Sequence, residues 1–146
     1  MPAVEPPSPL SIHHAHPSLR LDEAAVRAAV ECVVEGEGVR LRELSVVLAD
    51  RATVHALNRE WLGHDNPTDV VSFPLDEEAA AEGVIEGEVY VDLDTAAERA
   101  PEFGGAFEEE ALRYVVHGLL HLVGHDDATD ADRARMRALE DRYLCP

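Results

Sequence analysis

The spacing of apolar residues along the chain predicts alternating helices and strands. Apolar side chains recur every three or four residues in five stretches, which is typical of helices with one buried face. These helices are expected from a cap at Asp22 to Gly36 or Gly38, from Arg51 to Leu62, from a cap at Asp94 or Thr95 to Ala100, from Phe107 to Val123, and from a cap at Thr129 or Asp130 to Leu144. Short β-branched runs predict strands at residues 44–49, 70–73 and 87–93.

These elements fit a single α+β domain with a mixed four-stranded sheet backed by helices. Strands 70–73 and 87–93 are expected to pair as antiparallel neighbours. Residues 1–17 hold five of the nine prolines, so we expect a flexible segment there, or an edge strand at residues 10–13. The domain then covers residues 18–146. The acidic residues 76–85 are expected to form a mobile loop, and residues 101–105 a linker.

A pair of histidines within an apolar helix is the main chemical signal in the sequence. His117 and His121 are four residues apart, so both imidazoles face the same side of the helix and can reach one ion. Gly124 can end the helix and turn the chain back, so that Asp127 supplies a third ligand. The spacing matches the zinc site of metzincin proteases, and it predicts a zinc-metalloprotease-like domain. In those proteases, however, a general-base Glu occupies the position of Gly118.

Other interpretations of this stretch remain open from the sequence. His125 and Asp126 are close rivals of Asp127 as the third ligand, and the two helical histidines could simply be core residues. Because Gly is unfavourable inside a helix, Gly118 suggests that another group approaches the backbone there. One Zn²⁺ per chain is expected, since two imidazoles favour zinc. The carboxylate shifts the preference somewhat towards Mn²⁺ or Mg²⁺.

The chain contains the sequence Pro-Thr-Asp-Val-Val-Ser-Phe-Pro at residues 67–74 and His-Gly-Leu-Leu-His-Leu-Val-Gly at residues 117–124. These two motifs, in this order, resemble the YbeY family of bacterial endoribonucleases, known as rRNA maturation factors. The resemblance covers roughly residues 40–144. The family's usual ending of the second motif is Gly-Tyr-Asp-His, whereas this chain reads Gly-His-Asp-Asp at residues 124–127. The third histidine is therefore replaced by Asp127.

The resemblance implies a metal-dependent, single-strand-specific endoribonuclease. Such an enzyme would act in the cytoplasm on ribosomal RNA of the small ribosomal subunit, in maturation of the rRNA 3′ end and in ribosome quality control. It also implies that Thr68 and Ser72 line the substrate site. The position of the family's arginine is occupied by Leu62 here. Arg59 lies three residues earlier on the same helical face, and we expect it to take over as a phosphate clamp.

His64 is a second candidate catalytic residue, because a histidine can act as an acid or a base near neutral pH. The alternative is an ordinary solvated loop histidine. No apolar run is long enough to span a membrane, and no signal peptide is apparent.

The net charge of −18 is unusual for a protein that binds RNA. Thirty acidic residues oppose twelve basic ones, all of which are arginines. Such a field repels a polyanion at low salt. Either the arginines and the metal form a local positive cleft, or the protein works in high salt, where a Debye length of about 3 Å at 1 M screens the charge.

Two other functions fit the same pattern. The metzincin-like spacing suggests a metallopeptidase or another metallohydrolase, but Gly118 leaves a peptidase without its usual base. The altered third ligand and the acidic surface suggest a ribosome-associated protein with a structural metal. A structural site would close all four coordination positions with protein ligands.

Overall fold

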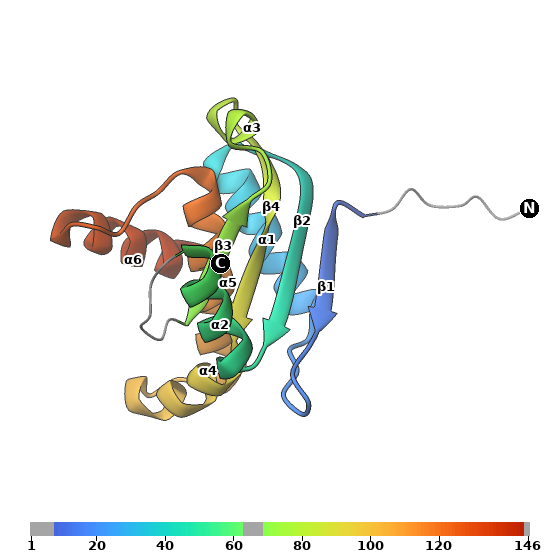
Figure 1. Cartoon of the computed structure of the whole chain (residues 1–146). Helices are drawn as coiled ribbons and strands as arrows, with labels where there is room; N and C mark the ends of the chain where they lie inside the picture. Colours follow the sequence, from blue (N-terminus) through green and yellow to red (C-terminus); the bar gives the residue numbers. More distant parts are fainter. Residues whose placement is uncertain (1–7, 63–68, 145–146) are drawn as a thin grey trace, which may run out of the picture.

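A four-stranded mixed sheet forms the centre of the protein (Figure 1). The computed structural model describes residues 8–62 and 69–144. The strand order is β1-β2-β4-β3. β1 pairs in parallel with β2, β2 pairs in parallel with β4, and β3 runs antiparallel to β4, as predicted. The strands are β1 (Leu10–His14), β2 (Arg40–Ala49), β3 (Val70–Pro74) and β4 (Val84–Asp92).

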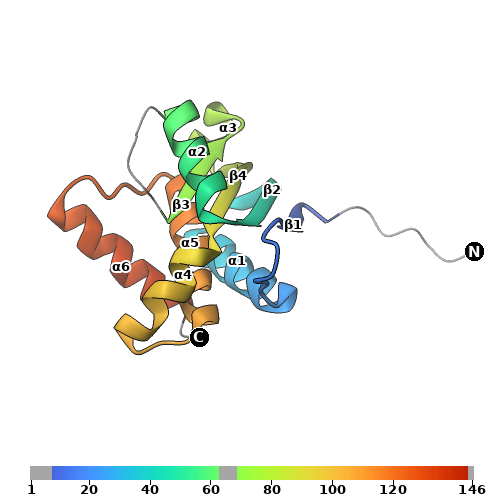
Figure 2. The same ribbon diagram turned by 60° about the horizontal axis from the view of Figure 1, so that its bottom comes forward.

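Helices cover both faces of this sheet (Figure 2). α1 and α5 pack on one face in the large core cluster, while α2 packs on the other face over Val71 and Phe73. The helices are α1 (Glu23–Glu37), α2 (Arg51–Leu62), α3 (Glu77–Ala81), α4 (Leu93–Arg99), α5 (Phe107–Val123) and α6 (Asp130–Leu144), with a 3₁₀ helix η1 (Ala100–Phe103) between α4 and α5. The expected α+β architecture is confirmed. None of the helices in the described part of the chain is long and apolar enough to cross a membrane.

Helix caps account for most of the boundaries. The Asp22 carboxylate accepts the backbone N–H of Ala24 at the start of α1, and Gly38 ends the helix with φ = 67°. Thr129 Oγ1 accepts the N–H of Asp132 at the start of α6. The caps at Asp22, Gly38 and Thr129 were all among those expected from the sequence.

The strands β2 and β4 begin earlier than predicted, at Arg40 and Val84, and three further segments differ from the prediction. α4 is capped by Asp92, whose carboxylate accepts the N–H and hydroxyl of Thr95, so the helix begins before the predicted cap at Asp94 or Thr95. The stretch expected to be a mobile loop contains α3, because Asp76 caps it and Ala79 is buried. The predicted linker at residues 101–105 mostly continues as η1. For α3, local capping by Asp76 decided the structure.

α5 lies unusually close to the sheet at Gly118. A Cβ atom at this position would be 2.6 Å from Val89 Cγ1 and 2.9 Å from Val70 Cγ2. The hydroxyl of Ser72 also donates a hydrogen bond of 2.8 Å to the Gly118 carbonyl. The groups that approach this backbone are therefore side chains of the sheet. The absence of a side chain at Gly118 allows α5, with its histidines, to pack closely on the sheet.

Replacing Gly118 with Ala should lower the free energy of unfolding by about 1–3 kcal/mol, because the added methyl overpacks a well-filled core. Helix propensity alone would favour Ala by about 1 kcal/mol, so the sign of the change separates the two effects. Urea unfolding monitored by circular dichroism measures it. Gly105→Ala is the matched control, because the new methyl would face only the end of the flexible Glu109 side chain. A Gly118→Ala protein as stable as wild type would contradict this account of the packing.

Candidate metal centre

Helix α5 brings the two predicted histidines together. His117 and His121 lie one turn apart on the side of α5 that is not pressed against the sheet, and their Nε2 atoms are 3.1 Å apart. Their rings meet edge to face, with centroids separated by 4.7 Å. Both side chains are partly exposed, so a bound ion and a substrate could reach them.

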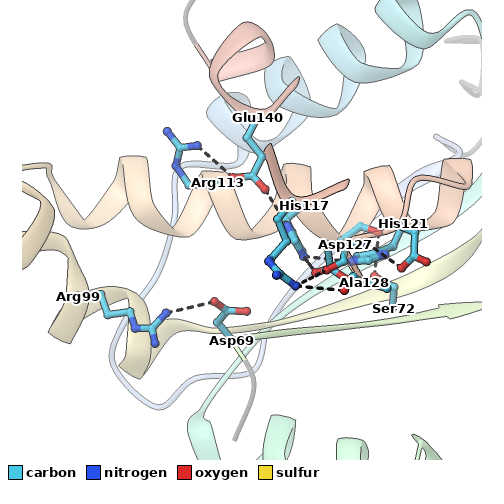
Figure 3. A network of polar contacts seen from close by, with 12 residues as sticks. Asp69, Ser72, Arg99, Arg113, His117, His121, Asp127, Ala128 and Glu140 are labelled. Atoms are coloured by element: carbon cyan, nitrogen blue, oxygen red, sulfur yellow. Dashed lines mark hydrogen bonds and ion pairs between the residues drawn. The ribbon is translucent and has the colours of Figure 1, made fainter. Parts of the chain in front are cut away.

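The turn after α5 adds a carboxylate to this pair (Figure 3). Gly124 has φ = 122°, and its N–H group donates to the carbonyls of Leu120 and His121, which reverses the chain. The Asp127 Oδ2 atom then lies 3.4 Å from His117 Nε2 and 3.5 Å from His121 Nε2. One donor atom from each of the three residues therefore converges on a common point, and this group could hold a metal ion.

The two rival ligands have other contacts. His125 turns towards the end of α1, where its Nε2 contacts the Glu37 carboxylate, and the Tyr143 hydroxyl donates to the same carboxylate. Burial would raise the pKa of Glu37, but these two hydrogen bonds and the charge of His125 outweigh it and lower the pKa. Asp126 is exposed and accepts the backbone N–H of Asp127 at 2.8 Å. The geometry therefore favours Asp127 over both rivals.

Glu140 of α6 is a partner of His117 that sequence reasoning missed. Its Oε2 atom is 2.7 Å from His117 Nδ1, and its Oε1 atom accepts from Arg113 at 3.1 Å. Because an ionised carboxylate only accepts hydrogen bonds, Nδ1 of His117 donates. In a neutral imidazole this leaves the Nε2 lone pair facing His121 and Asp127. In metal sites of proteins, a ligand histidine commonly donates its second ring N–H to a carboxylate, which fixes the orientation of the ring.

The environment of His117 is strongly anionic. Burial opposes protonation of the ring, but the hydrogen bond and charge of Glu140, with the charges of Asp69 and Asp127, outweigh it and raise the pKa of His117. Burial in turn raises the pKa of Asp69, an effect that the nearby His117 and Arg99 partly offset. Negative charge close to two imidazole rings favours the binding of a cation between them.

A cavity of about 240 Å³ opens beside His117 and Asp127. Asp69 lines it, and its carboxylate is 3.6 Å from Arg99 (Figure 3). Four arginines also line the cavity: Arg99, Arg113, Arg133 and Arg137. They come from three separate parts of the chain, so no local sequence pattern could have grouped them.

The remaining predicted site residues are placed less centrally. Ser72 lies beneath α5 with its hydroxyl bonded to Gly118. Arg59 is exposed on α2, which covers the face of the sheet opposite to α5, and it does not line the cavity beside His117. His64 and Thr68 lie outside the described residues.

The chain is similar to several known proteins. The sequence model of the family Endoribonuclease YbeY matches residues 12–145. A relative from Salinibacter ruber (strain DSM 13855 / M31), named Endoribonuclease YbeY, is 57% identical over 96% of this chain and 92% of its own length. One of the same name from Chlorobium phaeovibrioides (strain DSM 265 / 1930) is 43% identical over 85% and 81%. The solution structure of TM1509 from Thermotoga maritima aligns with a TM-score of 0.60 and 30% identity, over 92% of this chain and 86% of that one. The chain belongs to the YbeY endoribonuclease family.

Proposed function

We propose that this protein is a metal-dependent endoribonuclease that cuts single-stranded RNA in the maturation of the small-subunit rRNA 3′ end and in ribosome quality control. The convergence of His117, His121 and Asp127 beside one cavity carries the proposal, in a chain whose relatives are named endoribonucleases. We assign the activity to the domain of residues 18–146, to whose sheet the preceding segment adds β1 (Leu10–His14) as an edge strand. Its partners are then ribosomal RNA and the small ribosomal subunit, in the cytoplasm.

The spacing of the three donor atoms supports zinc as the ion, one per chain. Zinc bonds of about 2.0–2.2 Å at tetrahedral angles correspond to separations of about 3.3–3.6 Å between donor atoms. The two separations that involve Asp127, 3.4 and 3.5 Å, lie in this range, and the separation of 3.1 Å between the histidine nitrogens is slightly shorter. The donor types also fit, since imidazole nitrogen suits zinc, while the carboxylate oxygen of Asp127 would also accept Mn²⁺ or Mg²⁺.

The protein's own side chains provide the setting for RNA cleavage. Zinc bound by these residues would supply a Lewis acid that offsets negative charge on a phosphate oxygen as the phosphodiester bond breaks. Glu140 holds His117 in the tautomer that presents Nε2. Asp69 lies in the cavity, where its carboxylate pairs with Arg99 at 3.6 Å. We further propose Ser72 and Thr68 as substrate-binding residues and His64 as a catalytic residue.

A peptidase function has less support from the structure. The position at which metzincins carry their general base is Gly118, and its backbone is packed against Val70, Ser72 and Val89. A longer side chain could not be accommodated there without moving α5 from the sheet. No peptidase is among the relatives described above, and the family match is to endoribonucleases.

Arg59 is proposed as a phosphate-binding residue from the family resemblance. Replacing it with Ala should reduce cleavage of single-stranded RNA about tenfold, because a charged hydrogen bond to a phosphate is lost, while the zinc content stays unchanged. Elemental analysis and a gel assay with a labelled RNA measure both quantities. Because Arg59 does not line the cavity beside His117, unchanged cleavage would assign the role to another arginine.

Cleavage by the purified protein tests the proposed function directly. A labelled single-stranded oligoribonucleotide and the same RNA annealed to its complement are incubated with the protein, each with and without a chelator. We expect internal cuts in the single strand only, and none after chelation. Cleavage of a peptide substrate, with no RNA cleaved, would instead favour a metallopeptidase.

A further inference from the structure

The arginines around the metal centre differ in how they are engaged. Four of the twelve arginines in this chain of net charge −18 line the one cavity beside His117. Arg99 pairs with Asp69, and Arg113 pairs with Glu140 and Asp141. These two guanidinium groups are therefore already neutralised by carboxylates and serve to hold the site together.

The other two arginines lie on α6. Arg133 pairs with Asp130 and also donates to the carbonyls of Asp127 and Ala128, at 3.2 Å each, so it fastens the loop that carries Asp127. Arg137 is exposed and forms no ion pair with any carboxylate of the described residues. It is the arginine of this cavity whose five N–H donors are available to a ligand.

Arg137 is positioned by the periodicity of α6. The cavity is lined by one face of this helix, at positions 133, 136, 137 and 140. These residues are three or four apart, as expected for neighbours on a helix surface. Glu140 of this face binds the ring of His117. Arg137 is thus one turn from the residue that supports the metal ligand, and it also borders a second cavity with Gly105 and Glu109.

We propose that Arg137 binds a phosphate of the RNA strand adjacent to the metal centre and leads the strand out along α6. This inference rests on the proposed ribonuclease function. A guanidinium matches a phosphate with two parallel hydrogen bonds, and such contacts account for much of the affinity of proteins for nucleic acid. Because the net charge of the protein repels RNA, an arginine at the site without a carboxylate partner should contribute a larger share of the RNA affinity.

Arg135 provides a matched control on the same helix. It is exposed like Arg137 and only two residues away, but it pairs with Asp132 at 3.6 Å and does not line the cavity. Arg135→Ala and Arg137→Ala remove the same charge from the same helix. A difference between them therefore reports the position of the guanidinium relative to the site, and general electrostatic attraction cancels.

Fluorescence anisotropy with a labelled single-stranded oligoribonucleotide, over a KCl series from about 0.05 M, tests the proposal. Arg137→Ala should weaken binding roughly tenfold at the lowest salt and reduce the slope of log affinity against log salt by about 0.7. Arg137→Lys should recover part of the affinity. Arg135→Ala should stay within about twofold of wild type. Circular dichroism and metal content confirm that each variant is folded and loaded.

The outcomes separate this inference from the proposed function. If the wild type cleaves and binds RNA while Arg137→Ala and Arg135→Ala bind equally well, the role of Arg137 is wrong and the ribonuclease function stands. If Arg137→Ala binds weakly but the loaded wild type cuts no RNA, the contact is right and the cleavage function is wrong. If the wild type binds no RNA at any salt, both are overturned.

Discussion

Replacing Asp127 with Ala will remove the metal and RNA cleavage together. Asp127 supplies one of three converging donor atoms, and its oxygen lies 3.4 and 3.5 Å from the two imidazole nitrogens. Loss of a ligand that contacts the metal should weaken metal binding by more than the roughly 10–100-fold seen for supporting residues. Cleavage of single-stranded RNA should fall to the same extent. Competition with a chromogenic chelator measures the affinity, and a gel assay measures cleavage.

Asp126→Ala is the control for this prediction. Asp126 is the neighbouring aspartate, is exposed, and contacts the backbone N–H of Asp127 instead of the histidines. Its replacement should leave the metal bound. If Asp127→Ala retains the metal while Asp126→Ala or His125→Ala loses it, the third ligand is wrongly assigned here.

Replacing Glu140 with Gln should weaken metal binding about 10–100-fold. The carboxylate accepts from His117 at one oxygen and from Arg113 at the other. A glutamine of the same shape has a single oxygen, so it can serve only one of these two donors. His117 then loses the partner that fixes its tautomer, or Arg113 loses part of its neutralisation. Isothermal titration of the metal-free protein with zinc measures the change.

Asp141→Asn is the matched control for Glu140. Asp141 is the adjacent residue on α6 and accepts from the same Arg113 at 2.8 Å, but it is mostly exposed and does not contact His117. Its replacement should leave zinc affinity within about twofold. Equal zinc affinities for the two variants would show that Glu140 only pairs with Arg113 and does not support the metal ligand His117.

The sequence predicted those parts of the structure that depend on local spacing. α5 runs from Phe107 to Val123 as expected, because its apolar period and Gly124 define both ends. The meeting of His117 with His121 follows from a separation of four residues. The start of α4 was missed, because three possible capping side chains lie within four residues of one another, and the tertiary contacts of Asp94 with His16 and the Arg51 N–H decided between them.

The parts of the site that depend on packing could not be predicted. Glu140 is 23 residues from His117 along the chain, and only the docking of α6 on α5 joins them. Gly118 indicated a close approach, but the sequence did not say that Val70 and Val89 make it. The rival ligands could be separated only once His125 was seen to contact Glu37 at the end of α1.

The charge of the site also became clear only in three dimensions. A local positive cleft was one of the two explanations offered for a ribonuclease of net charge −18. The cavity does gather four arginines, but four carboxylates line it as well: Asp69, Glu110, Asp127 and Glu140. Asp69 and Glu140 pair with two of the arginines. A cation at the three donor atoms would therefore contribute much of the positive field that RNA meets. Cleavage measured across a KCl series tests the second explanation, and an optimum below about 0.2 M would exclude adaptation to high salt.

The central claim is that a zinc ion held by His117, His121 and Asp127 is required for RNA cleavage. It is tested most directly by measuring zinc per chain and cleavage of single-stranded RNA in the same samples, before chelation, after chelation, and after zinc is restored. We expect about one zinc per chain, loss of both zinc and cleavage with the chelator, and recovery of both on restoration. Undiminished cleavage by the zinc-free protein, or a fully loaded protein that cuts no RNA at any salt concentration, would contradict the claim.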